Sequence, residues 1–434
     1  MSGFSRRDIF KLGVAGVAAG GMLGAMPSAA VANGLQFQPE EGAKLRLLRW
    51  KRFVGGDEEL WVKNTEKFTK LTGVPVKIER EFWEDVRPKA AVAANLGSGP
   101  DIVLGWFDDP HQYPEKLVDM TDLCTYLGGK YGGWAPVAKT YGTKGDKWIS
   151  LPIGASGSCI VYRKSYMEEA GFSEFPKDTD GFLKLMQGLK KNGHAGGLAC
   201  GHAVGDGNNW VHWVVWAFGG KVVNENNEVV LDSPETVAAL EYARELYQTF
   251  VPGTLSWLDG HNNKAFLADK IGLTSNGISI YYAAKKNKTP FVDDIYHAPY
   301  PIGPSGEAGE CHLFTQAMLF KYSKYPNAAK AYLQFMMEKE QYAPWQQAAI
   351  GYITHSLNYY DNNPIWTVDP KHTPYRDTVK RMKPNSNAGE LGYASAAVMA
   401  DYVLLDMVAE AASGQSTPKE AATRAAKRAR RYYG

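Results

Sequence analysis

The stretch from residue 45 to residue 104 reads LRLLRWKRFVGGDEELWVKNTEKFTKLTGVPVKIEREFWEDVRPKAAVAANLGSGPDIVL. Three extended apolar runs stand in it, at residues 45–50, 74–78 and 101–104. Between them, apolar side chains recur with the spacing of a helix face, over residues 58–71 and 83–96. A glycine follows each helical segment, which is the usual chemistry of a helix end. This strand–helix–strand–helix–strand order predicts an α/β sheet with parallel pairings.

Further along the chain, glycines and prolines interrupt extended segments in two places. Residues 146–162 are extended but broken by Gly154 and Gly157, and residues 295–304 run through Tyr300-Pro-Ile-Gly-Pro304. Such breaks are typical of a chain that crosses between two lobes. Two terminal helices are expected, at residues 398–413 and 418–432.

Length and composition restrict the class of protein. A chain of 434 residues predicts two to four domains or one two-lobed body. The hydrophobic fraction of 44% excludes global disorder. The formal net charge of +2 argues against a nucleic-acid partner, since such proteins show a clear basic excess.

The first 32 residues have the order of an export signal. Arg6-Arg7 is followed by a weakly apolar, glycine-rich stretch and then by Ala30-Val31-Ala32, the expected cleavage site. The paired arginines resemble a twin-arginine signal, which indicates a periplasmic protein. A permanent membrane anchor is the alternative, but the glycines leave the stretch weakly hydrophobic. Removal of the signal leaves a formally neutral chain.

No local pattern for catalysis or metal binding is found in the sequence. The nucleophile elbow, the phosphate loop and the His-Glu-x-x-His motif do not occur, and the nine histidines are scattered singly. We therefore predict a protein that is not an enzyme and has no cofactor and no metal. The cysteines form no Cys-x-x-Cys pair, so they either make one or two disulfides or act as small buried apolar residues. They are Cys124, Cys159, Cys200 and Cys311.

Aromatic residues stand beside polar residues at the expected strand ends and helix starts. Ligands of open α/β sheets bind outside the carboxyl ends of the strands, and aromatic faces with hydrogen-bonding neighbours suit sugar rings. Packing in the core is the competing interpretation for each tryptophan. The candidate ligand-binding residues are Trp50, Arg52, Trp83, Trp106, Asp108, Asp109, Asn208, Asn209, Trp210, Trp257, Asn276 and Tyr281.

Several segments in order carry a family resemblance. They are Phe68-x-x-x-Thr72-Gly-Val74-x-Val76, Gly99-Pro-Asp-Ile-Val103, Trp148-x-x-Leu-Pro-Ile153, Val161-Tyr-Arg-Lys164, Ser233-Pro-Glu235 and Tyr300-Pro-Ile-Gly-Pro304. The chain resembles the extracellular solute-binding proteins of ABC importers, in the group that includes maltose-binding protein. The resemblance covers nearly the whole chain after the signal.

The resemblance implies a two-lobed periplasmic binding protein fold of type II, an α/β architecture. Each lobe would be a sheet flanked by helices, with a multi-strand hinge between the lobes. Lobe 1 would comprise residues 44–153 and 298–346, and lobe 2 residues 154–297 and 347–434. In sugar-binding members Trp50 and the Trp106-x-x-Asp109 loop match pocket positions, and residues 208–210 match a pocket segment of the second lobe.

The resemblance also implies a function. We expect the periplasmic substrate-binding component of an ABC transporter, a monomer that captures a polar small molecule, with a carbohydrate favoured, and delivers it to an inner-membrane permease. Lys51 and Arg52 leave open a charged solute, such as a sugar acid or a phosphorylated polyol. Two rival functions are an exported twin-arginine-dependent enzyme and the ligand-presenting subunit of a sensor.

Overall fold

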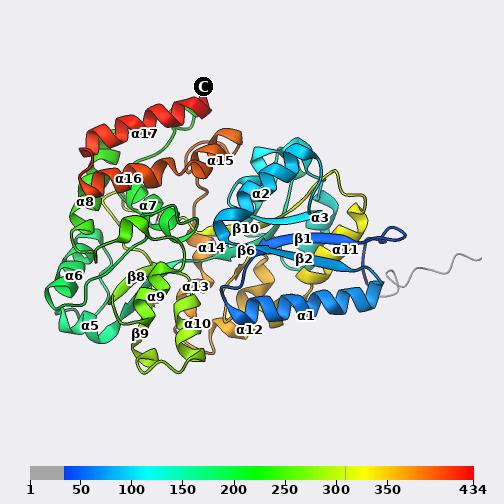
Figure 1. The fold of residues 1–434 in the computed structure, drawn as a ribbon, viewed down its shortest axis with the longest axis horizontal. Helices are drawn as coiled ribbons and strands as arrows, with labels where there is room; N and C mark the ends of the chain where they lie inside the picture. The colour runs from blue at the N-terminus through cyan, green and yellow to red at the C-terminus, as the bar shows by residue number, and fades with distance from the viewer. Residues whose placement is uncertain (1–33, 308) are drawn as a thin grey trace, which may run out of the picture.

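The structure is a computed structural model that describes residues 34–307 and 309–434, arranged as two lobes (Figure 1). The predicted signal at residues 1–32 lies outside the described residues. Within them, no helix is both long and apolar enough to cross a membrane. The four cysteines are all buried and unpaired, so of the two interpretations open from the sequence the structure has the free thiols.

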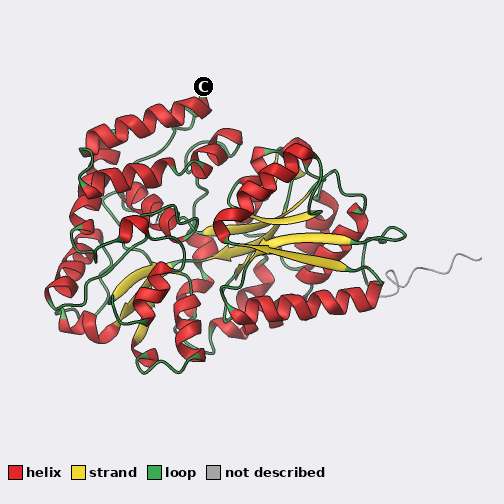
Figure 2. Ribbon diagram, in the orientation of Figure 1, coloured by secondary structure: helices red, strands yellow, loops and turns green. Residues whose placement is uncertain are grey.

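The first lobe is built on a mixed sheet, drawn in yellow in Figure 2, which in the described chain has the strand order β11-β6-β10-β3-β1-β2. β1 pairs in parallel with β2 and β3, as the opening stretch predicts. β10 lies antiparallel between β3 and β6, and β11 pairs with β6. The strands are β1 (Leu45–Trp50), β2 (Val76–Glu81), β3 (Ile102–Trp106), β6 (Leu151–Ser156), β10 (Leu313–Leu319) and β11 (Thr354–His355).

Helices cover both sides of this sheet, with α1 and α2 on opposite sides in Figure 1. α1 is followed by Gly73, whose φ of 76° favours a residue without a Cβ, and the Gly73 N–H donates to the carbonyl of Thr69. α1 packs against α11 and α12, while α2 packs against β3 and β1. The helices are α1 (Gly55–Thr72), α2 (Trp83–Leu96), α3 (Thr121–Lys130), α4 (Pro136–Gly142), α11 (Pro326–Met337) and α12 (Lys339–Ala348).

The second lobe contains a smaller sheet with the order β8-β7-β9, in which β7 is antiparallel to both neighbours. Its strands are β7 (Cys159–Arg163), β8 (Leu273–Asn276) and β9 (Ile295–Ala298). All residues of α7 (Asp206–Ala217) are buried, so this helix runs through the core of the lobe. The other helices of this lobe are α5 (Lys164–Glu169), α6 (Thr179–Lys191), α8 (Pro234–Tyr247), α9 (His261–Leu267), α10 (Ser279–Lys286), α15 (Tyr393–Ala400), α16 (Val403–Ser413) and α17 (Pro418–Tyr433). The short helices α13 (Thr373–Arg376) and α14 (Thr378–Arg381) contact β11 of the larger sheet.

The chain passes from one sheet to the other at three places. β6 leads into β7 through Gly157 and Ser158, residues 299–312 join β9 to β10, and the chain leaves the larger sheet after β11. Gly154 lies where β11 meets β6: its φ is 152°, and a Cβ there would stand 2.1 Å from the carbonyl oxygen of Thr354. Glycine is required for this approach.

The predicted fold class is confirmed, because helices flank a sheet in each of two lobes. The residue boundaries of the lobes remain a prediction.

Candidate ligand-binding site

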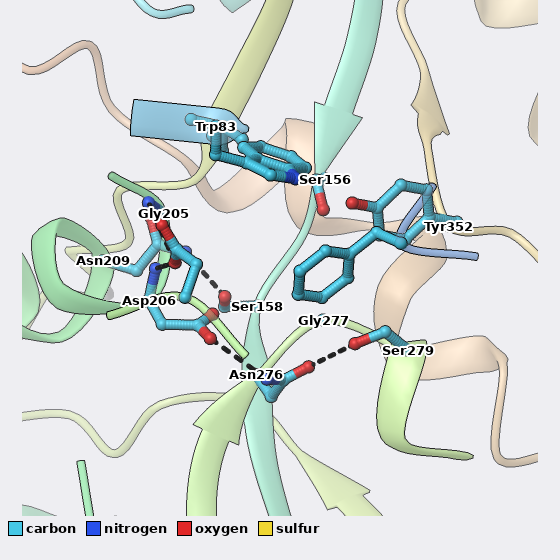
Figure 3. Close-up of a pocket in the computed structure, with 13 residues that line it drawn as sticks. Trp83, Ser156, Ser158, Gly205, Asp206, Asn209, Asn276, Gly277, Ser279 and Tyr352 are labelled. Atoms are coloured by element: carbon cyan, nitrogen blue, oxygen red, sulfur yellow. Dashed lines mark hydrogen bonds between the residues drawn. The ribbon is translucent and has the colours of Figure 1, made fainter. Parts of the chain in front are cut away.

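A small cavity lies between the two lobes (Figure 3). Its free volume of about 30 Å³ has room for about one water molecule, so the lobes must move apart to admit a larger solute. Loops and helix starts that follow β1, β2, β6 and β8 contribute its walls, so it opens at the carboxyl ends of these strands. The lining residues are Phe53, Trp83, Ser156, Ser158, Gly205, Asp206, Asn209, Asp259, Asn276, Gly277, Ser279, Leu313 and Tyr352.

The first lobe supplies an aromatic wall, made by Phe53, Trp83 and Tyr352. Trp83 is the first residue of α2, and its ring stacks on Trp106 with a centroid separation of 4.5 Å and an interplanar angle of 7°. Phe53 meets the edge of Trp83 at 5.8 Å and lies parallel to Tyr352 at 6.4 Å. Trp106 and Phe53 therefore hold the ring of Trp83 in place at the cavity wall.

The second lobe supplies a polar wall, made by side chains at the start of α7, the end of β8 and the start of α10. The Nδ2 of Asn276 donates to Asp206 Oδ2 at 3.0 Å, and the Oγ of Ser279 donates to Asn276 Oδ1 at 2.8 Å. The Nδ2 of Asn209 donates to the Oγ of Ser158 at 2.6 Å. Figure 3 shows these groups opposite Trp83 and Tyr352. The wall is held by its own hydrogen bonds before any ligand arrives.

Two carboxyl groups face the cavity from this second lobe. Asp259 accepts from the backbone N–H groups of Asp206, at 2.8 Å, and Gly205, so it caps the start of α7. Burial raises the pKa of Asp259 to about 6. Burial, and then the negative charge of Asp259, raise the pKa of Asp206 well above its usual value. The cavity wall is therefore acidic, and the carboxyl group of Asp206 has no positively charged partner among the described residues.

Two buried polar atoms of the lining have no partner among the described residues: the Oδ1 of Asn209 and the Nε1 of Trp83. Asn209 is 1% exposed and Trp83 is 7% exposed. A buried polar group without a hydrogen bond is costly, so such groups are expected to meet a ligand or water. One atom is an acceptor and the other a donor.

Three of the twelve residues predicted from the sequence line the cavity: Trp83, Asn209 and Asn276. Trp50 and Trp106 lie behind Trp83 and are fully buried, with Trp50 contacting both rings at 5.6 and 5.2 Å. The Nε1 of Trp50 donates to Asp57 at 3.2 Å. These two tryptophans support the aromatic wall without lining it.

The other seven predicted residues are held elsewhere by protein partners. Arg52 pairs with Glu58 and Glu59 on the surface. Asp108 accepts from Asn385 and Ser395, and Asp109 pairs with Arg87. The remaining four make internal contacts: Asn208 donates to the Val204 carbonyl, Trp210 to the Ala199 carbonyl and Tyr281 to Asp369, while Trp257 packs on Gly197.

Sequence reasoning missed the acidic pair and the small hydroxyl residues. Asp206 stands two residues before the predicted segment 208–210, and Asp259 two residues after Trp257. A glycine next to each aspartate was the available signal, since glycines mark tight turns near a ligand. Ser156 and Ser158 flank Gly157 in the segment that the sequence predicts as a crossing.

A polar and aromatic cavity between two lobes is the kind of place where proteins of this architecture hold a small molecule. The chain belongs to the family of bacterial extracellular solute-binding proteins, whose family model matches residues 63–374. The predicted resemblance is thus confirmed. Among curated relatives, a protein of Deinococcus radiodurans named "Probable ABC transporter-binding protein" is 20% identical over 286 residues, 64% of this chain and 67% of the relative.

Solved structures share the fold. Maltose-bound MalE3 of T. maritima matches with a TM-score of 0.79 and 19% identity, over 90% of this chain and 99% of that one. A sugar transporter protein of Arthrobacter chlorophenolicus with bound laminaribiose matches with a TM-score of 0.78 and 18% identity, again over 90% and 99%. At such identities the likeness establishes the architecture.

Proposed function

We propose that the protein is the substrate-binding component of an ABC transporter and that it captures a hydroxyl-rich solute of the carbohydrate class. The observation that carries this proposal is the facing of an aromatic wall and a polar wall across one cavity. A sugar ring offers apolar C–H faces to aromatic side chains and hydroxyls to amides and carboxylates. The sugars bound by two proteins of the same fold support the same class.

The arrangement of the two walls explains capture. Neither lobe alone encloses a ligand, so the solute is held fully only when the lobes close on it. Such a ligand shifts the population toward the closed form without any bond being made or broken. The closed form then presents the surface that a membrane permease recognises, and the carrier acts as a monomer.

The lining argues against the anionic solutes that Lys51 and Arg52 left open. Among the described residues that line the cavity, none is lysine, arginine or histidine, and two are aspartates. A sugar acid or a phosphorylated polyol would meet repulsion there. A neutral or cationic solute fits this wall.

The proposal also covers how the protein is exported from the cytoplasm. The paired arginines and the small residues before position 33 support export by the twin-arginine pathway, with cleavage after Ala32 and release into the periplasm. Gel electrophoresis of periplasmic and membrane fractions tests this part. An Arg6→Lys, Arg7→Lys chain should accumulate uncleaved in the cytoplasm, and normal export of that chain would contradict the route.

A thermal-shift screen tests the function. The mature protein is heated with mono- and oligosaccharides, polyols, sugar acids and amino acids, and calorimetry then measures the affinity of each hit. A rise of several degrees with one carbohydrate class is expected, since a ligand that binds only the folded state stabilises it. Hits confined to amino acids or sugar acids would overturn the proposal.

A further inference from the structure

We propose that the captured solute carries a protonated amine and that the carboxylate of Asp206 binds it. This inference rests on the proposed function and names its substrate class: an amine-bearing, hydroxyl-rich solute such as an amino sugar. The argument comes from the partners of Asp206, from the charges around the cavity and from an unpaired acceptor beside it.

Asp206 is a buried carboxylate with neutral partners. Its side chain is part of the cavity wall and the residue is 8% exposed. Its Oδ2 accepts from the amides of Asn262, at 2.9 Å, and Asn276, at 3.0 Å. In the described part of the chain, no lysine, arginine or histidine nitrogen lies within 4.0 Å of it. Two amides orient the carboxylate but do not neutralise its charge.

Two other buried aspartates in the same molecule are paired with arginines. Asp57 lies 2.5 Å from the guanidinium of Arg49, and Asp109 lies 2.6 Å from that of Arg87. Asp108, which also has no ion pair among the described residues, is turned away from this cavity and hydrogen-bonded to Asn385 and Ser395. Asp206 is therefore a buried acid that has no countercharge and faces space for a ligand. Burial of a charge is unfavourable unless a partner of opposite charge is supplied.

Two further carboxylates near Asp206, those of Asp259 and Glu84, add negative charge that a bound cation would balance. Asp259 of the same lobe raises the pKa of Asp206. Glu84, on α2 of the opposite lobe, in turn raises the pKa of Asp259. Closure of the lobes thus brings carboxylates from both sides together, and like charges oppose that approach. A cation between them converts this repulsion into attraction.

The remaining walls suit an ammonium group. The Oδ1 of Asn209 is buried, lines the cavity and has no partner among the described residues, so it can accept from a second N–H. An ammonium has three donors to give. The rings of Trp83 and Tyr352 also line the cavity, and aromatic rings attract cations. Hydrogen bonds from a charged donor to a carboxylate are about twice as strong as neutral ones.

A neutral sugar is the competing ligand for the same site. Its hydroxyls can donate to Asp206, but they leave the charge in place, so closure would require the carboxyl to take up a proton. The two ligands therefore differ in proton exchange. An amine lowers the pKa of the carboxyl and releases protons or exchanges none, whereas a neutral ligand raises it and takes protons up.

Matched ligand pairs test the inference by isothermal titration calorimetry at pH 7.5. The probes are glucosamine with glucose, galactosamine with galactose, and a diglucosamine with its N-acetylated form. The amine member of at least one pair should bind 10-fold or more tightly. Asp206→Asn should reduce this preference to less than 3-fold, while Asp108→Asn, which removes a buried acid outside the cavity, should keep it.

The outcomes separate the two proposals. Neutral members that bind as tightly as their amines overturn the amine and leave the proposed function intact. Silence from every carbohydrate, with or without an amine, overturns the function. An amine preference that survives in Asp206→Asn overturns the role of Asp206. If that variant does not fold, titrations of the wild type at pH 6, where the amine of the free ligand is already protonated, in buffers of different ionisation enthalpy decide, because net proton uptake with the amine overturns the inference.

Discussion

The Oγ of Ser395 donates a hydrogen bond of 2.6 Å to the Oδ2 of Asp108, and this bond joins the two lobes. Asp108 follows β3 of the larger sheet, while Ser395 lies on α15, which packs on α16 and α17. Asn385 donates to the same oxygen at 2.8 Å. The other oxygen, Oδ1, is buried and has no partner among the described residues. Burial raises the pKa of Asp108 to about 6.

This raised pKa predicts how stability depends on pH. The folded protein holds a proton on Asp108 up to about pH 6, whereas the unfolded chain loses it near 3.8. The contribution of Asp108 to the free energy of unfolding therefore falls as pH rises from about 4 to 6, by about 3 kcal/mol in total. Asp108→Asn should gain stability relative to wild type over this window. Urea unfolding at pH 4 and pH 7.5 measures it, and an equal difference at both pH values would contradict the prediction.

The buried ion pair between Arg49 and Asp57 predicts a large loss of stability. Asp57 accepts from Arg49 at 2.5 Å and also from the indole N–H groups of Trp50 and Trp345. Asp57→Ala leaves a buried guanidinium without a countercharge and should cost about 3–5 kcal/mol. Arg52→Ala is the matched control, since Arg52 is half-exposed and its pairs with Glu58 and Glu59 are worth less than about 1 kcal/mol. Denaturant unfolding measures both variants, and similar losses in their free energies of unfolding would contradict the prediction.

Gly154 predicts a local intolerance of any side chain. Its positive φ and the 2.1 Å approach to the Thr354 carbonyl mean that Gly154→Ala must push β11 away from β6. We expect a fall in the melting temperature of at least about 8 °C, or failure to fold. Gly129→Ala is the control, because Gly129 lies in α3 with open space around it and an alanine there favours the helix. A Gly154→Ala protein with the melting temperature of the wild type would show that position 154 tolerates a Cβ beside the Thr354 carbonyl.

The stacked tryptophans predict losses of both affinity and stability. Trp83→Ala removes the ring that lines the cavity and should lower affinity for the solute found by the screen at least about 10-fold; because this ring is itself buried and stacked on Trp106, stability should fall as well. Trp106→Ala removes a fully buried ring behind it and should lower both affinity and stability, the latter by about 3–5 kcal/mol. Calorimetry and thermal melting measure the two effects. Unchanged affinity in Trp83→Ala would take this residue out of the site.

The fold was largely predictable because its signals are local. The parallel strands β1, β2 and β3 alternate with helices that have glycine ends, and such a pattern needs no knowledge of distant residues. The apolar run at 74–78 located β2 only roughly, because the strand (Val76–Glu81) continues into three charged residues. Ser233 followed by Pro234 also predicts the start of α8, where the Ser233 hydroxyl accepts from the Thr236 N–H. The broken segments at residues 146–162 and 295–304 indicated crossings between two lobes, and the family resemblance supplied the residue ranges of each lobe.

The site was less predictable because a strand end fixes a position but not the direction of a side chain. Trp50 and Trp106 both end strands as expected, yet their rings pack behind Trp83. Asp206 and Asp259 come together only when the loop before α9 reaches the start of α7, across 53 residues of chain. A single aspartate in a loop has no spacing by which to recognise it. Asn209 and Asn276 were found because they stand next to a glycine or an aromatic residue at an element boundary.

The three passages of the chain between the sheets have a consequence for dissecting the molecule. Neither half is a continuous piece of sequence, so no simple truncation yields one half alone, and no single peptide carries the complete cavity wall. A protease that cuts one passage leaves two others intact. A nicked protein should therefore elute from a sizing column as one particle and keep its cavity, although it runs as two bands once denatured.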